Sequence, residues 1–225
     1  MAYVLGFIYA DGCIYPSVRG SYLSVTSIDE PIIVNIKRWM ESDHTITKTV
    51  FDDNRKPRFA LKIGNKEIYT DLLKLGVYPN KSFTVRMPDI PPVVLRDFLR
   101  GYFDGDGCVN LYRSKGITKE IILRQLKIIF TSGSRLFLED LLRILKGRFL
   151  LRLAKVYSNG NAFQLRFSTH DSITLFKFMY EDTPNEMFFL RKFKTFQAYF
   201  SLRPQRIDKE VEIILRYVSG GHVVK

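Results

Sequence analysis

A ten-residue motif occurs in two similar copies in this 225-residue chain, and no other feature of the sequence restricts the fold as much. Residues 4–13 read VLGFIYADGC, and residues 99–108 read LRGYFDGDGC. Each copy starts as an apolar run that predicts a helix and ends with aspartate, glycine and cysteine. A single Asp-Gly after an apolar run would be typical of a hairpin turn. Two aligned copies, each followed by strand-like sequence, instead predict a duplicated structural unit.

Small residues are spaced four apart in both copies. Gly6 and Ala10 in the first copy, and Gly101 and Gly105 in the second, therefore share one face of each predicted helix. Such a bare stripe lets two helix backbones approach closely. Because the runs are too short and too polar to span a membrane, we expect a seam between two helices of a soluble protein.

This packing would bring the aspartates Asp11 and Asp106 together at the C-terminal ends of the two helices. Helix C-termini carry unpaired carbonyl oxygens and the negative end of the helix dipole. Carboxylates and carbonyl oxygens around one point are hard ligands that suit Mg²⁺ or Ca²⁺. We therefore predict a metal site made by Asp11 and Asp106, helped by the carbonyl oxygens of Ala10 and Gly105.

The two motifs resemble those of the LAGLIDADG homing endonucleases. Both keep the small third residue and the Asp-Gly ending, and Asp104 keeps an acid at the sixth position, where the first copy has Tyr9. The resemblance extends to about Pro204. It implies a single-chain, pseudo-twofold, intron-encoded enzyme that cuts both strands of a long DNA site across the minor groove and leaves short 3′ overhangs. Mg²⁺ is then the expected cofactor, and Ca²⁺ is expected to bind without supporting cleavage.

The rest of the sequence predicts the order helix, hairpin, helix, hairpin, helix in each half. Strands are expected at 13–19, 22–26, 45–50, 58–63, 108–113, 121–131, 149–157 and 162–168. Helices are expected at 32–40, 65–75, 92–105, 134–145, from 171, at 185–201 and at 208–218. The fold class is α+β: two pseudo-symmetric αββαββα repeats, each with a four-stranded antiparallel sheet in a DNA-binding saddle, and the motif helices at the centre. The expected divisions are residues 1–90, 91–204 and a helical tail at 205–225.

Polar and basic side chains alternate with apolar ones along these strands. Such a row is either an ordinary solvated sheet face or a surface that contacts base edges and phosphates in a DNA groove. We favour DNA contact for the set as a whole. Its members are Tyr15, Ser17, Arg19, Ser24, Thr26, Arg58, Lys62, Gln125, Lys127, Gln164, Arg166 and Ser168, with Arg135 as a further phosphate contact.

The resemblance also implies a lysine after the third helix of each repeat that supports the transition state. The matching positions are Lys81, in Pro-Asn-Lys-Ser, and Lys192, in Leu-Arg-Lys-Phe. At the second position Arg191 or Lys194 is an open alternative.

In the family, a polar residue that positions water stands at the end of the second strand. Ser27 and Ser132 match this position. Many relatives have a longer amide there, so the alternative for each serine is that it caps the next helix.

The chain has 35 lysines and arginines against 23 aspartates and glutamates, a net charge of +12. A surplus of this size is more typical of a protein that binds a polyanion than of a protein whose surface is basic without such a partner. Cys13 and Cys108 hold equivalent positions and are expected to be buried in the first strands, and zinc-ligand spacing is absent. Without a signal peptide or an apolar run of about 20 residues, we expect a monomer in the prokaryotic cytoplasm or an organelle, neither secreted nor membrane-bound.

Two other functions stay open. Some relatives are maturases, which bind intron RNA and assist its splicing, and a transcription regulator could use the same fold. Neither function requires Asp11, Asp106 and Lys81, so the presence of all three favours the endonuclease.

Overall fold

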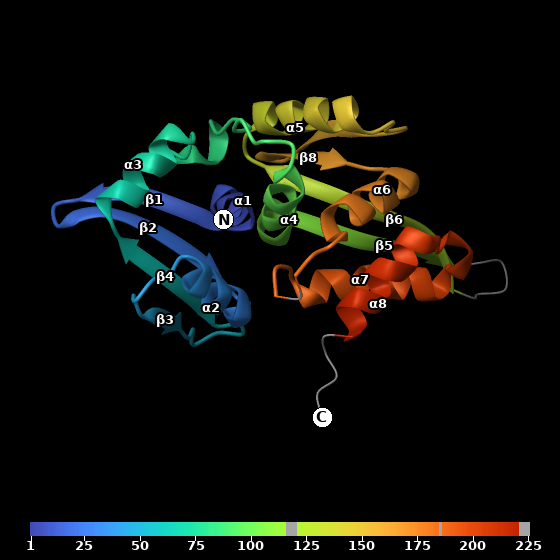
Figure 1. Cartoon of the computed structure of the whole chain (residues 1–225), viewed down its shortest axis with the longest axis horizontal. Coiled ribbons are helices and arrows are strands. Elements are labelled where there is room, and N and C mark those ends of the chain that lie inside the picture. The colour runs from blue at the N-terminus through green and yellow to red at the C-terminus, as the bar shows by residue number, and fades with distance from the viewer. Residues whose placement is uncertain (116–120, 185, 221–225) are drawn as a thin grey trace.

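The computed structural model describes residues 1–115, 121–184 and 186–220, and it shows the same order of elements twice (Figure 1). The first half comprises α1 (Ala2–Asp11), β1 (Gly12–Ser17), β2 (Gly20–Ser27), α2 (Glu30–Trp39), β3 (Ile46–Thr49), β4 (Arg58–Gly64) and α3 (Lys66–Lys74). The second half comprises α4 (Leu95–Asp106), β5 (Gly107–Lys115), β6 (Ile121–Ser132), α5 (Arg135–Arg148), β7 (Lys155–Asn159), β8 (Ala162–Arg166), α6 (Thr169–Tyr180) and α7 (Leu190–Leu202). Helix α8 (Lys209–Gly220) follows, and short 3₁₀ turns lie at Lys81–Phe83 and Pro204–Arg206.

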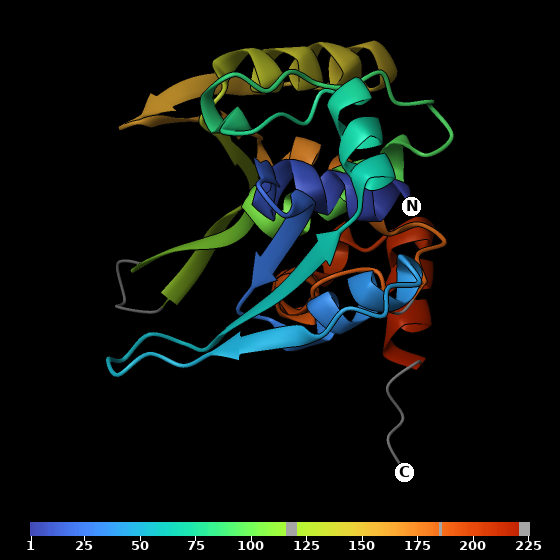
Figure 2. The ribbon, with the colours of Figure 1, turned by 90° about the vertical axis from the view of Figure 1, so that its left-hand side faces the viewer.

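Each half contains one antiparallel four-stranded sheet. The strand orders β1-β2-β4-β3 and β5-β6-β8-β7 are identical apart from numbering, so the predicted α+β fold with two repeats is confirmed. Alternate side chains such as Leu23, Val25 and Leu61 are buried beneath α2 and α3, which leaves the other face of the sheet open. In Figure 2 the strands of both sheets extend to one side of the molecule and most helices lie on the other.

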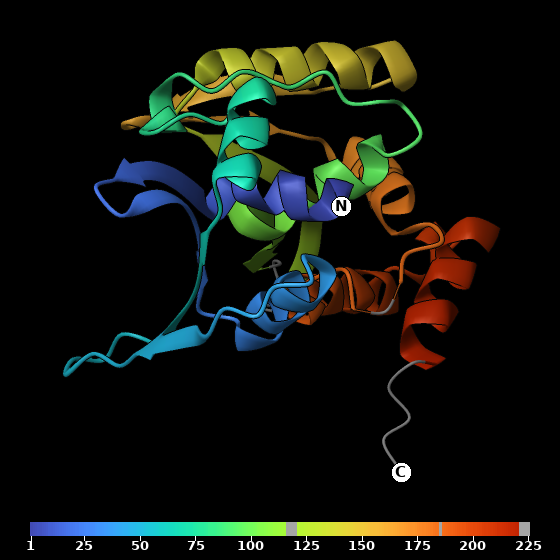
Figure 3. The ribbon, with the colours of Figure 1, turned by 60° about the vertical axis from the view of Figure 1, so that its left-hand side comes forward.

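The seam between the motif helices lies where the small residues predicted it. Figures 1 and 3 show α1 and α4 side by side between the two sheets. A methyl group at Gly6 would overlap the carbonyl oxygen of Phe98, and one at Gly101 would overlap that of Tyr3. The two backbones are therefore in direct contact, and only glycine fits at either position.

Several predicted element boundaries differ from the structure. Residues 149–154 are not a strand, because the backbone N–H groups of Arg152 and Leu153 donate to the Asp171 carboxylate (2.8 and 2.9 Å) and not to a neighbouring strand. The first hairpin turns at residues 18–19, whereas the predicted first strand continues to residue 19. Helix α7 begins at Leu190, whereas the predicted start at Asn185 lies outside the described residues.

The cysteines are placed differently from the prediction that they are buried. Cys13 is exposed, Cys108 is half-buried, and both are free thiols. Their neighbours explain this: in β1 the side chain of Ile14 points into the core, so Cys13 faces the open side, opposite Ser24 of β2. The strand begins at the glycine after the motif aspartate, and this start sets which residues face the core.

Helix α8 packs on the second half. Val211 and Ile214 are buried, and Lys177 of α6 forms ion pairs with Asp208 and Glu210. This confirms the predicted helix at 208–218. The divisions at residues 90/91 and 204/205 stay predictions, and 221–225 of the predicted tail lie outside the described residues. No helix of the described residues is long and apolar enough to cross a bilayer.

Candidate active site at the helix seam

The structure brings Asp11 and Asp106 together at the ends of α1 and α4. Both are the last residues of their helices, and Asp11 Oδ2 lies 3.2 Å from the place that a Cβ of Gly105 would occupy. Burial raises the pKa of Asp106 to about 6, and the negative charge of Asp11 adds to this effect. Burial also raises the pKa of Asp11, while the charges of Lys192 and Lys81 act to lower it. Two carboxylates that repel each other at one point favour a cation between them.

A buried lysine lies beside each motif end. Lys81 Nζ donates to the carbonyl oxygen of Gly12 (2.8 Å), and Lys192 Nζ donates to that of Gly107 (2.6 Å). Because Gly12 and Gly107 each follow a motif aspartate, the two lysines occupy equivalent positions. At the second position Lys192 is therefore the structural equivalent of Lys81. Of the two alternatives, Arg191 forms an ion pair with Asp29, and Lys194 is exposed on α7.

The two lysines have different surroundings. Lys192 Nζ also donates to the carbonyl oxygens of Phe103 (2.5 Å) and Asp104 (2.7 Å), so all three of its protons have acceptors at the end of α4. Burial lowers the pKa of Lys192 to about 8 and also lowers the pKa of Lys81. Both side chains bring positive charge to the two aspartates.

Ser27 and Ser132 lie at the ends of β2 and β6, as predicted. Each hydroxyl oxygen accepts the N–H of the residue two positions later (3.1 Å in both cases). These bonds close small turns before α2 and α5, so neither serine is the helix cap that the alternative reading gave it; at α5 that role belongs to Ser134. The predicted role in positioning water remains open to both.

The acid at the sixth motif position supports the fold. Asp104 is fully buried, and its Oδ2 accepts the Tyr3 hydroxyl (2.7 Å) and the Phe189 N–H (2.9 Å). Burial raises the pKa of Asp104 to about 6. Because Tyr3 belongs to α1 and Phe189 precedes α7, Asp104 joins three segments and is not one of the two carboxylates at the helix ends.

Most of the predicted DNA contacts lie on the open sheet faces. On the first sheet these are Tyr15, Ser17, Ser24, Thr26, Arg58 and Lys62, with Arg19 in the turn between β1 and β2. On the second sheet they are Gln125, Lys127, Gln164 and Arg166. The basic groups lie against aromatic rings: Lys62 Nζ is 4.4 Å from the ring centroid of Tyr22, and Lys127 Nζ is 4.9 Å from that of Tyr112.

Two predicted contacts lie elsewhere. Ser168 follows the end of β8, and its hydroxyl caps α6 by accepting the Asp171 N–H (3.2 Å), because the strand stops two residues early. Arg135 is the first residue of α5 and forms an ion pair with Glu139 (2.8 Å). Tyr22 of β2 is not among the predicted contacts, although its spacing of two residues from Ser24 places it on the same open face.

Comparison with known proteins agrees with this arrangement. Residues 94–177 match the family described as LAGLIDADG-like domain. Among solved structures, the chain is similar to the K262A mutant of I-SmaMI (TM-score 0.62, 15% identity, 100% of this chain and 99% of that chain covered). It is also similar to the meganuclease I-AabMI bound to uncleaved DNA (TM-score 0.59, 12% identity, 97% of each chain covered). This chain has the LAGLIDADG fold.

A third similar LAGLIDADG structure is the homing endonuclease I-WcaI bound to its DNA recognition sequence (TM-score 0.59, 15% identity, 85% of this chain and 82% of that chain covered). No curated protein matches this sequence. The match to the LAGLIDADG-like domain includes the second motif but not the first. The equivalence of the first motif to the second rests instead on the structure, in which α1 packs directly on α4.

The donors at the LAGLIDADG seam suit Mg²⁺. Within residues 1–115, 121–184 and 186–220, no cluster of three or more histidine, cysteine, aspartate or glutamate side chains could hold a metal. Mg²⁺, however, is usually held by one or two carboxylates together with waters and substrate phosphates. Asp11 and Asp106, with the carbonyl oxygens at the two helix ends, fit that requirement.

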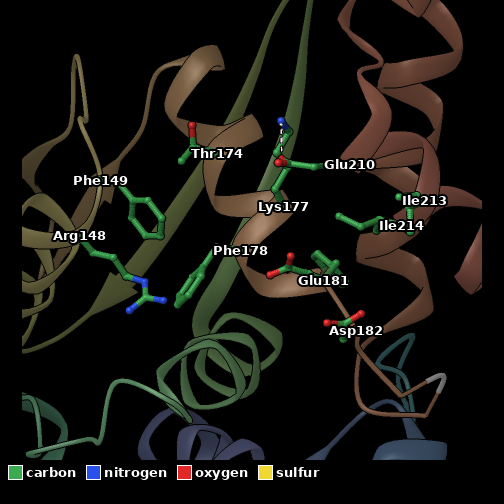
Figure 4. A pocket seen from close by; sticks show the side chains of 11 residues that line it. Arg148, Phe149, Thr174, Lys177, Phe178, Glu181, Asp182, Glu210, Ile213 and Ile214 are labelled. Atoms are coloured by element: carbon green, nitrogen blue, oxygen red, sulfur yellow. Dashed lines mark ion pairs between the residues drawn. The ribbon is translucent and has the colours of Figure 1, made fainter.

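A hollow lies away from the seam, beside α6 and α8 (Figure 4). It has a volume of about 440 Å³, and its apolar wall is formed by Phe149, Phe178, Ile213 and Ile214. Most of its charged groups form ion pairs: Lys177 with Glu210 (2.9 Å), and Glu181 with Arg96 (3.4 Å). Arg148 lies over the ring of Phe178, 4.8 Å from the ring centroid. This hollow has the character of a packing groove, so the seam is the better candidate for chemistry.

Proposed function

We propose that this protein is a site-specific endonuclease that hydrolyses phosphodiester bonds in both strands of a long DNA target with Mg²⁺. The observation that carries the proposal is the pair of carboxylates, Asp11 and Asp106, at the end of the seam with one buried lysine beside each motif. The similar structures described as bound to DNA support a double-stranded DNA partner. An intron-encoded origin and a monomeric state belong to the same proposal.

The residues at the seam have distinct roles in this mechanism. Asp11 and Asp106 hold the metal, with the carbonyl oxygens of Ala10 and Gly105 as further ligands. When bound, Mg²⁺ activates water and neutralises negative charge on the phosphate and the leaving oxygen. Lys81 and Lys192 supply fixed positive charge where the phosphate gains negative charge in the transition state.

The open sheet faces account for binding. A net charge of +12, together with lysine and arginine side chains on both faces, would neutralise DNA phosphates. Tyrosines beside these cations add flat contact surface, and Gln125 and Gln164 offer amide groups to base edges. Ser27 and Ser132 are proposed to position water at the ends of the two central strands.

The test is cleavage of a plasmid library with randomised inserts, and of an intronless host-gene junction, with Mg²⁺ and with EDTA. We expect discrete double-strand breaks at one long site with Mg²⁺ and none with EDTA. Asp11→Asn and Asp106→Asn should give no breaks at this site. Asp71→Asn is their matched control, because Asp71 lies exposed on α3 and pairs only with Lys74 among the described residues. Tight binding of DNA or intron RNA without any break would contradict the proposal and favour the regulator or the maturase.

A further inference from the structure

A hollow on one side of the seam gathers two arginines beside Asp11. It has a volume of about 290 Å³, and its wall includes Asp11, Thr26, Ser27, Arg58 and Arg191. Arg58 begins β4 of the first half, whereas Arg191 comes from α7 of the second half. The hollow therefore combines an arginine and two hydroxyl groups of the first half with an arginine of the second half beside Asp11, and the buried Asp104 also lines it.

Arg191 is held in a fixed position in this hollow. Its Nε donates to Asp29 Oδ2 (3.0 Å), and its guanidinium lies 4.8 Å from the ring centroid of Phe189. Among the described residues, no bond from its two terminal nitrogens is found, so they are open to a ligand. Arg58 is exposed and lies 5.9 Å from the ring centroid of Phe51.

The register of the two sheets shows that the other half lacks the first of these arginines. Ser27 pairs with Phe59 in the first sheet, and Ser132 pairs with Phe163 in the second. The residues that precede these two phenylalanines are therefore equivalent to each other: Arg58 in the first half and Ala162 in the second.

The second arginine is also missing from the other half. Lys81 and Lys192 are equivalent because each donates to the glycine after a motif aspartate. The residues that precede these two lysines are therefore equivalent to each other: Asn80 in the first half and Arg191 in the second. The charges of both arginines act on the Asp11 carboxylate, whereas the charges that act on Asp106 are those of Asp11, Lys81 and Lys192.

We propose that Arg58 and Arg191, with the hydroxyls of Thr26 and Ser27, form a phosphodiester-binding subsite beside Asp11 that the Asp106 side lacks. A planar guanidinium can hold two phosphate oxygens at once, and two of them in one hollow bind a phosphate more tightly than hydroxyls alone. The DNA strand that passes Asp11 is therefore held more firmly and is cut before the other strand. This inference rests on the proposed endonuclease function.

The experiment measures each strand separately. A target duplex carries a different fluorophore on each strand, and the rate of nicking of each strand is followed in a single turnover with excess enzyme and Mg²⁺. We expect the wild-type protein to cut one strand faster. Arg58→Gln and Arg191→Gln should each slow that strand by roughly tenfold to a hundredfold, because each removes a charged hydrogen bond, and should change the other strand by about twofold or less.

Ala162→Arg supplies the matched gain-of-function variant. It places an arginine at the position equivalent to Arg58, and it should speed up cutting of the slower strand and reduce the difference between strands. Arg58 has no ion pair within the described residues, so loss of folding does not explain an effect of its substitution on one strand.

The possible failures separate the two proposals. Equal cutting of both strands by the wild-type protein, or equal slowing of both strands by Arg58→Gln and Arg191→Gln, would overturn the subsite and leave the endonuclease function intact. A wild-type protein that cuts neither strand of any target would overturn both.

Discussion

A methyl group added to the seam should destabilise the protein and separate the two aspartates. In Gly101→Ala the new Cβ would overlap the carbonyl oxygen of Tyr3 and lie 3.0 Å from the backbone nitrogen of Phe7. These are backbone atoms of α1, which cannot rotate away as a side chain can, so the two helices must move apart. Overpacking of this kind costs about 1–3 kcal/mol, and for a chain of this size each kcal/mol lowers Tm by about 2–4 °C.

The expected decrease for Gly101→Ala is therefore roughly 2–12 °C in Tm, measured by calorimetry on the metal-free protein. Gly147→Ala is the control, because Gly147 lies in α5 and a Cβ there meets nothing within 4 Å. Alanine is the better helix former by about 0.5–1 kcal/mol, so this variant should be slightly more stable than wild type.

The refuting result is a Gly101→Ala protein as stable as wild type, or one no less stable than Gly147→Ala. Either outcome would mean that the backbones of α1 and α4 are not in direct contact. Cleavage should decrease with stability in Gly101→Ala, because Asp106 lies on the same helix that must move.

Three further predictions follow from the site. Asp11→Asn or Asp106→Asn should abolish double-strand cleavage and preserve DNA binding; full cutting by either variant, measured with Mg²⁺, would exclude that carboxylate as a metal ligand. Binding measured by anisotropy should weaken steeply as salt rises, as phosphate-dominated association does, and a flat response would contradict a basic DNA-binding face. Burial lowers the pKa of Lys192 to about 8, so cleavage should decrease as pH rises through 8 and this ammonium group loses its proton. The measurement is the single-turnover cleavage rate up to about pH 9.5, which lies above the pKa of Lys192 and below the value for lysine in a model peptide. A rate that stays constant over this range would contradict a need for the charge of Lys192.

The same pKa of Lys192 affects stability. A lysine whose pKa is lower in the folded state than in the unfolded state makes the protein more stable as pH rises from about 8 toward the unfolded value. Because burial also lowers the pKa of Lys81, that lysine adds to the same increase. Lys192→Met should reduce the increase, which a comparison of urea unfolding at pH 7.5 and pH 9.5 would detect. An unchanged increase in the variant would mean that another group is responsible.

The parts of the fold that the sequence predicts are those set by local spacing. Gly6 and Gly101 define the seam because a glycine four residues from another small residue makes one bare helical face. Asp11 and Asp106 follow from it, since each stands at the end of that face. The lysine equivalence needed the structure, because the bonds of Lys81 and Lys192 to Gly12 and Gly107 join residues far apart in the chain.

Other features depend on contacts that spacing does not show. The segment before β7 has strand-like composition, but the carboxylate of Asp171, on another element, takes the N–H groups of Arg152 and Leu153. Cysteine is one of the residue types most often buried, yet the side chain of Cys13 faces the open side because the strand starts at Gly12. The subsite with Arg58 and Arg191 draws on residues from both halves, which no single stretch of sequence brings together.

The bond between Tyr3 and Asp104 has a consequence for how the two halves can recombine. Across the seam the buried Asp104 accepts the hydroxyl of Tyr3, while the counterpart pair, Phe98 and Tyr9, meets ring to ring at 5.3 Å. In a homodimer of two second halves, Phe98 would take the place of Tyr3, and the carboxylate would lose its hydroxyl partner in a dry interior. The duplicated units have thus become complementary and no longer self-complementary, so engineered chimaeras would need to inherit Tyr3 together with Asp104.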